Sequence, residues 1–406
     1  MTALKTIIPP RWMAGRKTRR LISVLSSDAG SARFVGGCVR DAIIQKPAKD
    51  IDIAVTHPPE RVMGLLKKNK IRAIATGIDH GTVTAVMNGQ HYEITTLRRD
   101  VKTDGRHAEV AFTDDWQADA ERRDFTMNAI YCAVDGTLYD PVSGIDDLLA
   151  GRVRFIGDAG QRITEDYLRI LRLFRFYAYY GKTSLDPGDL AACQKHVEGI
   201  ATLSAERIRD EFFKILAAPN PAAIIDLMRT YGVMESVWAG AQKFSLLQNM
   251  VAASPQSDAM QRLMAVMMEN NCAPENVAAR FRLSTAQLRR IESAMNCARG
   301  GAPKNNSDDL HKIIYFHGAE SARDAALLWL AAQMITRDHA EAIVNAAGSW
   351  RRHEFPLTGH DVMAIGVTPG PKIGQLLAEV ESWWVDAGFP ADRAACLARL
   401  GEIAKQ

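Results

Sequence analysis

Apolar and polar residues follow two different patterns along this chain. Up to about residue 157, short apolar runs alternate with polar residues and are separated by glycine, proline and asparagine, as in β-strands joined by turns. Beyond that point such runs disappear, and alanine and leucine recur at helical spacing to the end. The pattern predicts an α/β head with a small mixed sheet, followed by an all-helical remainder.

The pattern also predicts the individual elements of the head. Asn88-Gly89 is expected to join two strands as a hairpin turn, because both residues tolerate positive φ. The charged segment 98–112 contains one glycine and predicts a mobile surface loop. The expected helices are 16–26, 39–45 and 58–69, and the expected strands are 33–35, 51–55, 71–76, 82–87 and 91–97.

The expected helices of the remainder include 164–180 and 204–217, and Ser204 would cap the second of these. No internal repeat or low-complexity segment is evident.

Composition adds constraints on size, charge and compartment. The chain has 406 residues, long enough for two or more compact units, and its net charge of +3 is far from polybasic. A nucleic-acid partner would therefore be held by local basic patches, at 11–20, 67–70 or Arg351-Arg352, each of which could equally be a solvated face. The six cysteines are scattered and show no C-x-x-C spacing, so neither a zinc site nor a disulfide framework is indicated, in agreement with a reducing cytoplasm. No secretory signal or membrane-spanning run is predicted.

The stretch 33–55, RFVGGCVRDAIIQKPAKDIDIAV, has the strongest chemical signal. Gly36-Gly37 would turn sharply from a strand into a helix and expose backbone N–H groups that suit a phosphate, with Arg40 one turn further on. On the next strand Asp50 and Asp52 would point to the same side, because side chains alternate with a period of two. An Asp-x-Asp alone is usually a solvated turn, but this combination predicts a magnesium site beside bound phosphates.

GGCVRD followed by DID resembles the first motif of the nucleotidyltransferases that include class II CCA-adding enzymes and bacterial poly(A) polymerases. The later motifs of that family follow in order over residues 20–240. The resemblance implies a catalytic head at 1–157, a neck that recognises the base at 158–230, and a body and tail that bind tRNA at 231–406. It also implies that Asp50 and Asp52 hold Mg²⁺. Glu93 ranks third, either as a further acidic residue near the metals or as a solvated strand residue.

ERRDFTMNAIY, Glu121 to Tyr131, resembles the family's second motif. Paired arginines are usually surface charge, but within this match Arg123 is expected to bind phosphate or ribose, as are Gly37 and Arg40. Asp124 would orient Arg123 or cap a helix. The resemblance also implies that the loop 98–112 assists the switch between nucleotides, and Arg98, Arg99 and Arg106 could reach phosphates. Asp140-Pro141 resembles the hinge motif, although VSG stands where two glycines are expected.

EDYLRILRLFRF, Glu165 to Phe176, resembles the fourth motif, whose Asp and Arg recognise the incoming base. Asp166 and Arg169 would share one face of a helix. Cytosine and adenine both place an amine donor beside a ring-nitrogen acceptor, so one Asp–Arg pair could accept CTP and ATP and reject GTP and UTP. Arg172 and Arg175 would bind phosphate or brace that pair. The bland alternative is a structural ion pair on a helix surface.

SAERIRDEFFKIL, Ser204 to Leu216, resembles the fifth motif, and its charged residues are expected to brace the neighbouring helix. The segment 356–377 resembles a tail element, where Lys372 at a helix start would suit an RNA phosphate.

These features predict a nucleotidyltransferase that adds C, C and A to the tRNA 3′ end, with tRNA, CTP and ATP as partners and Mg²⁺ as cofactor. No protein partner is implied. A bacterial poly(A) polymerase is the first alternative, but GIDHGTVTAV, Gly77 to Val86, resembles the CCA type. Enzymes that add only CC or only A stay open as alternatives. An inactive RNA-binding protein of the same fold is disfavoured, because it would be expected to lack one or more of the three acidic residues, and all three are present. A DNA-processing polymerase is disfavoured further.

Overall fold

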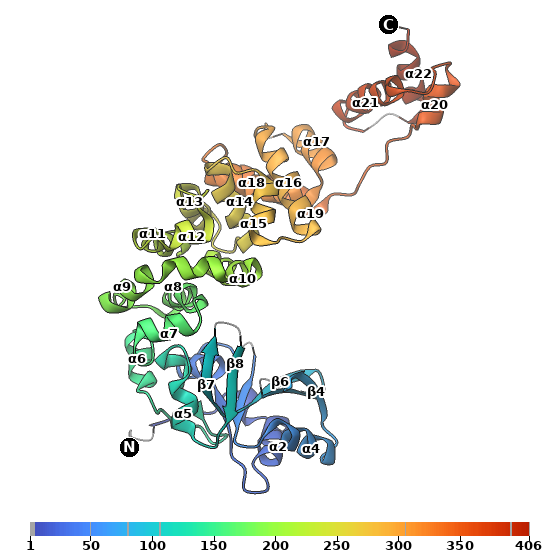
Figure 1. Ribbon diagram of the computed structural model, residues 1–406. Coiled ribbons are helices and arrows are strands. Elements are labelled where there is room, and N and C mark those ends of the chain that lie inside the picture. Colours follow the sequence, from blue (N-terminus) through green and yellow to red (C-terminus); the bar gives the residue numbers. More distant parts are fainter. Residues whose placement is uncertain are drawn as a thin grey trace. The chain divides into compact units, whose positions relative to one another are not determined.

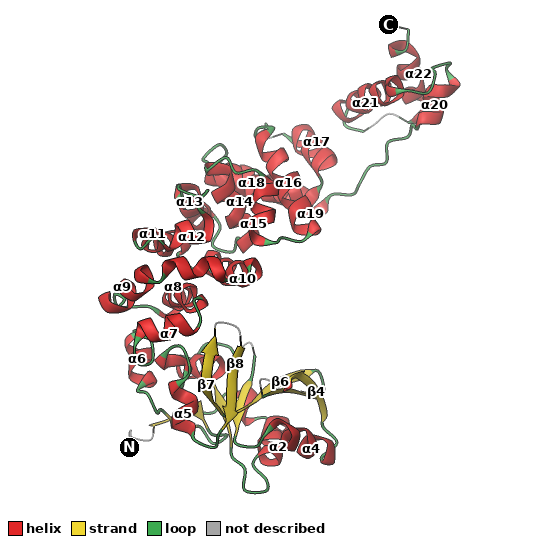
Figure 2. Ribbon diagram, in the orientation of Figure 1, coloured by secondary structure: helices red, strands yellow, loops and turns green. Residues whose placement is uncertain are grey.

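The computed structural model describes residues 5–48, 50–78, 81–104, 107–304, 306–389 and 392–405, and its elements are drawn in Figures 1 and 2. The chain divides into two units, Met1–Ala239 and Gly240–Gln406. The described strands all lie in the first unit, and the described part of the second is helical. The predicted change from α/β to all-helical structure is thereby confirmed, whereas the boundaries at residues 157 and 230 stay predictions.

An eight-stranded sheet forms the centre of the first unit, in the order β1-β10-β9-β2-β3-β6-β5-β4. β3 and β6 run parallel, and the other neighbours run antiparallel. Two central strands, β2 and β3, therefore carry the stretch with the strongest chemical signal. The strands are β1 (Lys5–Thr6), β2 (Ala32–Val35), β3 (Asp52–Val55), β4 (Arg72–Gly77), β5 (Thr82–Met87), β6 (Gln90–Thr96), β9 (Tyr131–Cys132) and β10 (Thr137–Tyr139).

The burial of β3 agrees with its central place in the sheet. Ile53, Ala54 and Val55 of β3 are all buried, as expected for a central strand covered on both faces.

The hairpin between β5 and β6 turns at Asn88 and Gly89, which have φ values of 50° and 80°. The two-residue turn predicted from the sequence is confirmed.

Residues 98–112 do not form the loop that the sequence predicted. The described residues of this segment form two antiparallel strands, β7 (Arg98–Asp104) and β8 (His107–Phe112), with Arg98 opposite Phe112. Thr113 N donates to Leu97 O at 2.9 Å, next to the Arg98–Phe112 pair. The prediction rested on the charge of the segment and on its glycine, whereas a two-stranded ladder satisfies its own backbone groups without an apolar run. Arg106 lies outside the described residues.

The helices of the first unit cover the sheet and then continue the chain beyond it (Figure 1). Phe125 connects the two parts, because its ring stacks on Phe155 at 4.8 Å and meets the edge of Phe176 of α8 at 5.2 Å. The helices are α1 (Arg11–Ala14), α2 (Arg16–Leu25), α3 (Gly37–Ile43), α4 (Pro59–Lys68), α5 (Trp116–Glu121), η2 (Thr126–Asn128), α6 (Gly144–Ala150), α7 (Ala159–Glu165), α8 (Leu168–Tyr180), α9 (Pro187–Lys195), η3 (Val197–Thr202), α10 (Ala205–Leu216), α11 (Pro221–Thr230) and α12 (Val233–Trp238).

The second unit has a buried core of its own. Trp329 of α18 is fully buried, and its indole N–H donates to Ala298 O at 2.9 Å. Val362, Trp384 and Leu400 belong to a further cluster near the chain end. The helices are α13 (Ser245–Ala253), α14 (Ala259–Glu269), α15 (Pro274–Phe281), α16 (Thr285–Arg299), α17 (Ser307–His317), α18 (Ala319–Ala331), α19 (Arg337–Ser349), α20 (Gly359–Ala364), α21 (Pro371–Asp386) and α22 (Arg393–Ile403).

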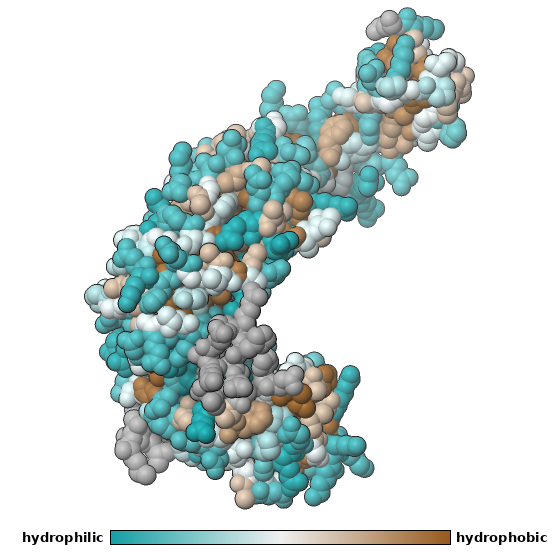
Figure 3. All heavy atoms as spheres, in the orientation of Figure 1, coloured by the Kyte–Doolittle hydropathy of each residue, from teal (hydrophilic) through white to brown (hydrophobic). Residues whose placement is uncertain are grey.

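The visible face of the helical elements is mostly hydrophilic, with apolar residues in small separate patches (Figure 3). Among the described residues, no helix combines the length and the apolar character needed to cross a membrane.

Candidate active site

A glycine turn brings three sequence-predicted features together. β2 ends at Val35, and Gly36 has φ 72° and ψ −134°, a backbone conformation that residues other than glycine rarely adopt. A Cβ on Gly36 would lie 3.7 Å from Asp52 Oδ2 and 4.0 Å from Arg123 Nη1. The positive φ therefore favours glycine at this position, and a carboxylate and a guanidinium both lie close to the turn.

Asp52 lies beside a second acidic residue on the neighbouring strand. It is the first residue of β3 and pairs in parallel register with Glu93 of β6. Burial and the negative charge of Glu93 raise the pKa of Asp52 to about 6, and Arg123 opposes this shift. The ionised form of Asp52 is thus disfavoured by its own surroundings, which is the condition that a bound cation relieves.

Asp50 is placed differently from the prediction. It lies in a bend and is exposed, because the described strand begins only at Asp52. The two carboxylates are therefore not held on one strand face by strand pairing. Asp50 still acts on Asp52, since its negative charge contributes to the raised pKa of Asp52.

The acidic residues fit a divalent cation of the magnesium type. Mg²⁺ usually keeps several waters and is held by one or two carboxylates together with substrate phosphates, and Asp50 and Asp52 supply two carboxylates. Among the described residues, no group of three or more His, Cys, Asp or Glu side chains could hold a metal ion. Glu93 therefore does not form a three-carboxylate metal site with Asp50 and Asp52. Its role as a third catalytic carboxylate stays a prediction.

Arg123 is anchored by a residue that the sequence reasoning did not identify. Asp119 of α5 has a side chain only 1% exposed, and it accepts from Arg123 Nη2 at 2.9 Å and from Arg122 Nη2 at 2.5 Å. The hydroxyl of Tyr131 donates to the same carboxylate at 2.7 Å. Burial alone would raise the pKa of Asp119, but the two arginine charges and the Tyr131 hydrogen bond lower it to about 2.

Asp124 binds Arg172 of α8 and not Arg123, which corrects the predicted pairing. Arg172 Nε donates to Asp124 Oδ2 at 2.6 Å, and Asn128 Nδ2 donates to Asp124 Oδ1 at 3.1 Å. Asp124 is 8% exposed, and the Arg172 charge lowers its pKa against the effect of burial. The sequence did not reveal Arg172 as the partner of Asp124, because Arg172 lies on α8, 48 positions further along the chain.

Arg40 extends the same polar network. Its Nη1 donates to Asn128 Oδ1 at 2.7 Å, and its guanidinium lies over the ring of Tyr180 at 4.2 Å. A Cβ on Gly37 would lie 3.6 Å from Arg40 Nη2. A chain of hydrogen bonds thus connects Arg40 through Asn128 and Asp124 to Arg172.

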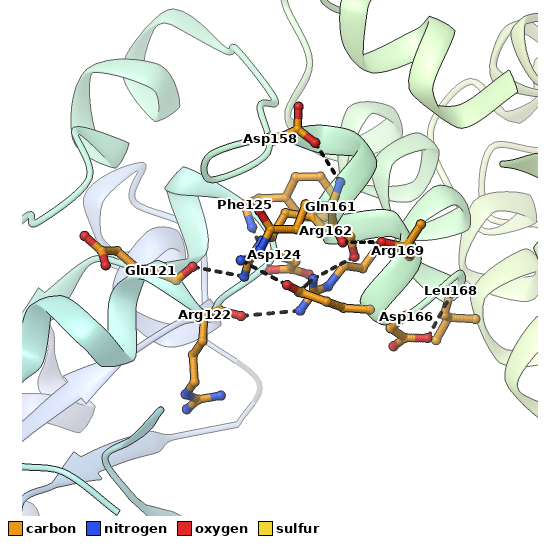
Figure 4. A network of polar contacts seen from close by, with 12 residues as sticks. Glu121, Arg122, Asp124, Phe125, Asp158, Gln161, Arg162, Asp166, Leu168 and Arg169 are labelled. Carbon is orange, nitrogen blue, oxygen red and sulfur yellow. Dashed lines mark hydrogen bonds and ion pairs between the residues drawn. The ribbon is translucent and has the colours of Figure 1, made fainter. Parts of the chain in front are cut away.

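The chain breaks its helix at Asp166, contrary to the predicted continuous helix. α7 ends at Glu165, Asp166 is extended with φ −156° and ψ 106°, and α8 begins at Leu168. Asp166 Oδ1 accepts from Leu168 N at 3.1 Å, so the side chain stabilises the new helix start (Figure 4). Asp166 and Arg169 therefore do not share one helix face.

Asp166 and Arg169 each have another partner. Arg207 of α10 donates from Nη2 to Asp166 Oδ2 at 2.7 Å. Arg169 donates from Nη1 to Glu165 at 2.5 Å and from Nη2 to Arg122 O at 3.3 Å (Figure 4). Arg207 thus braces the neighbouring segment, in the way predicted for the charged residues of its helix.

Arg175 pairs with a buried residue on α10. Its Nε donates to Glu211, whose side chain is 5% exposed and also accepts from Lys214 at 3.1 Å. Burial lowers the pKa of Arg175, and Glu211 opposes that shift. This pairing joins α8 to α10 and does not brace an Asp166–Arg169 pair.

In the hinge sequence VSG, the serine has a left-handed backbone and the glycine lies tightly against a neighbouring segment. Ser143 is left-handed with φ 60° and ψ 35°, and a Cβ on Gly144 would lie 2.1 Å from Thr126 O. Asp140 accepts from Gly144 N at 2.7 Å and from Ile145 N at 2.9 Å. Of the two positions where glycine was expected, only Gly144 therefore leaves no room for a side chain.

Known proteins resemble this chain over nearly its whole length. The family model described as "Poly A polymerase head domain" matches residues 32–154, and the one described as "Probable RNA and SrmB- binding site of polymerase A" matches residues 184–240. The CCA tRNA nucleotidyltransferase 1, mitochondrial, of Danio rerio is 32% identical over 390 residues, which cover 94% of this chain and 90% of the relative. The CCA-adding enzyme of Lactobacillus gasseri is 31% identical over 382 residues, with 91% and 93% covered.

A solved structure agrees with these sequence matches. The crystal structure of the Bacillus stearothermophilus CCA-adding enzyme in complex with CTP has a TM-score of 0.84 and 25% sequence identity to this chain. The likeness covers 98% of each chain.

Proposed function

Because this chain belongs to the family of CCA-adding tRNA nucleotidyltransferases, we propose that it adds C, C and A to the 3′ end of tRNA from CTP and ATP. The observation that carries the proposal is the meeting of Gly36, Asp52 and Arg123 at one turn. It supplies a carboxylate for a cation and a guanidinium for a phosphate, with backbone that can approach both.

The proposed cofactor is Mg²⁺, held by Asp50 and Asp52. When bound, it would supply activation of the attacking 3′-hydroxyl and neutralisation of phosphate charge during in-line transfer. The raised pKa of Asp52 supports this assignment, because negative charge gathered near a partly buried carboxylate favours a cation. Glu93 would add to that negative field.

Arg123 is proposed to contact the triphosphate or the ribose. Its guanidinium is fixed on one side by Asp119, and its Nη1 is directed to the glycine turn. A planar guanidinium in a fixed orientation suits an oxyanion, because two of its N–H groups can donate in parallel. Gly37 and Arg40 would line the same turn, where Arg40 acts mainly through Asn128.

The proposed base-reading residues are Asp166 and Arg169. A carboxylate accepts from the amine of cytosine or adenine, and a guanidinium donates to the ring nitrogen. Each side chain is engaged with a neighbour here, Asp166 with Arg207 and Arg169 with Glu165. Reading a base would therefore require them to share or exchange these partners.

Arg172 and Arg175 are proposed to support the neck rather than to bind phosphate. Each is bonded to a buried carboxylate, Asp124 and Glu211 respectively. The body and tail at 231–406 are proposed to hold tRNA, with Lys372 near the start of α21 as a candidate contact. The cytoplasm is proposed as the compartment because the cysteines lack disulfide spacing, and cell fractionation with an antibody to the chain would test it.

Incorporation of single labelled nucleotides tests the activity step by step. Three tRNA substrates, lacking three, two or one terminal residues, are each incubated with one of the four triphosphates and Mg²⁺. The proposal predicts CTP addition to the first two and ATP addition to the third. ATP tails of many residues would indicate a poly(A) polymerase, and C addition without A addition would indicate a CC-adding enzyme.

A further inference from the structure

Asp119 lies at the centre of a buried cluster, and its two carboxylate oxygens have separate donors. Oδ1 accepts from Arg122 Nη2 at 2.5 Å and Nε at 2.9 Å. Oδ2 accepts from Arg123 Nη2 at 2.9 Å and from Tyr131 Oη at 2.7 Å. One carboxylate thus separates two adjacent guanidinium groups that would otherwise repel each other.

The bonds of Arg123 to Asp119 determine which edge of the guanidinium faces the glycine turn. Nε and Nη2 both donate to Oδ2, at 3.2 Å and 2.9 Å. The third nitrogen, Nη1, lies 4.0 Å from the position of a Cβ on Gly36, where the Asp52 carboxylate is also close. The Arg123 side chain is 18% exposed, so its tip can reach a ligand while its other edge is buried.

The cluster is rigid because its parts belong to regular elements. Asp119 lies on α5, whose first turn is capped by Asp115 accepting from Gln117 N at 2.8 Å. Tyr131 lies on β9, and the edge of its ring meets Trp116 at 5.1 Å. An arginine held by such a cluster loses little freedom when it binds a ligand.

We propose that Asp119 is a positioning residue for nucleotidyl transfer, which acts by fixing the Arg123 guanidinium against the Gly36 turn. Asp119 itself touches neither nucleotide nor tRNA. The inference rests on the proposed function, and it assigns to a residue outside the recognised motifs the task of orienting a phosphate ligand. The pKa of Asp119, which Arg123 and Arg122 lower to about 2 against the effect of burial, agrees with this role, because the carboxylate that holds Arg123 is charged at neutral pH.

A double-mutant cycle between Asp119→Asn and Arg123→Lys tests the proposal. If Asp119 acts through Arg123, each single change lowers kcat about 10- to 100-fold, because a small misplacement near the reacting groups has effects of that size. The double variant is then no more than about threefold worse than Arg123→Lys alone. Losses that multiply in the double variant, or an unchanged kcat in Asp119→Asn, would overturn the proposal.

A matched control separates positioning from stability. Asp147 is also buried and pairs with two arginines, accepting from Arg152 Nε at 2.9 Å and Arg154 Nη2 at 2.9 Å. Asp147→Asn is expected to lower the melting temperature as Asp119→Asn does and to leave kcat within about twofold. Equal losses of kcat in both variants would contradict a positioning role.

Two further measurements make the outcome decisive. Tyr131→Phe removes one donor to Asp119 Oδ2 without changing any charge, and it is expected to lower kcat about threefold. It serves as the test if Asp119→Asn does not fold. An unchanged kcat in that variant would then count against the proposal. Equilibrium binding of CTP with Mg²⁺ separates the proposed function from the positioning role of Asp119. A wild-type protein that binds CTP but extends no tRNA would refute the proposed function. The positioning role predicts that Asp119→Asn weakens CTP binding, and unchanged binding would contradict it.

Discussion

Arg207 donates from Nη2 to Oδ2 of Asp166 at 2.7 Å, although the two residues are 41 positions apart in the chain. Asp166 lies between two helices, so its carboxylate is oriented by Leu168 N on one oxygen and by Arg207 on the other. The residue proposed to read the base is therefore held by a neighbouring helix and not by Arg169.

Replacing Arg207 by methionine is expected to weaken nucleotide selection. The Asp166 carboxylate would lose its fixed orientation, and the preference for CTP over UTP would fall about 3- to 10-fold. The melting temperature should change little, because an ion pair with side chains 36% and 27% exposed contributes about 0–1 kcal/mol. Arg207→Lys, which keeps the charge, is the control and should restore part of the preference. Unchanged ratios of kcat/KM among the four triphosphates would exclude this role.

Asp52→Asn is expected to abolish activity and yet stabilise the metal-free protein. The pKa of Asp52 is raised to about 6 in the folded state, so its contribution to stability is present below about pH 4 and is lost as the pH rises through 6. With a chelator present, the variant should therefore exceed wild type by roughly 1–3 kcal/mol above pH 7, and the difference should vanish near pH 4. Urea unfolding at both pH values measures it. A variant less stable than wild type at pH 7 would argue against the raised pKa.

Glu211→Gln is expected to destabilise the first unit by about 3–5 kcal/mol, because it leaves Arg175 buried without its anion. The double change Arg175→Met with Glu211→Leu should recover most of that loss, since it removes both charges. Chemical denaturation of the three proteins gives the comparison. If Glu211→Gln unfolds like wild type, the pair is not a structural one, and Arg175 would again be a candidate phosphate ligand.

Substitutions at the two hinge residues should change stability by different amounts. Ser143→Gly relieves a positive φ at the cost of chain entropy, so stability should change by less than about 1 kcal/mol. Gly144→Ala places a Cβ against Thr126 O and should cost about 2–4 kcal/mol. Melting curves of the two variants measure this, and a Gly144→Ala variant as stable as wild type would refute the steric requirement.

The sequence predicted the elements whose signal is local. The strand–turn–helix–strand of 33–55 and the Asn88-Gly89 hairpin are continuous in sequence, so glycine, asparagine and apolar spacing sufficed. The helix break at Asp166 was missed because helical spacing continues through it. In the sequence, nothing marks the break except an Asp that can cap the following helix.

Partners from distant segments could not be predicted in the same way. Asp119 and Glu211 look like surface charges in a polar stretch, and only tertiary packing buries them. Asp124 was expected to orient its neighbour Arg123 or to cap a helix, whereas the fold supplies Arg172 from 48 positions away. The spacing of Asp119 from Arg122 and Arg123, three and four residues further on, is nevertheless a signal that the sequence contains, because it allows these ion pairs to form.

The most direct test of the account is the length and sequence of the product when tRNA lacking its last three residues is incubated with CTP, ATP and Mg²⁺. Wild type is expected to add C, C and A and then stop, and Asp52→Asn is expected to add nothing under the same conditions. Long adenosine tails, no addition by wild type, or full addition by the Asp52→Asn variant would contradict the assignment of this site.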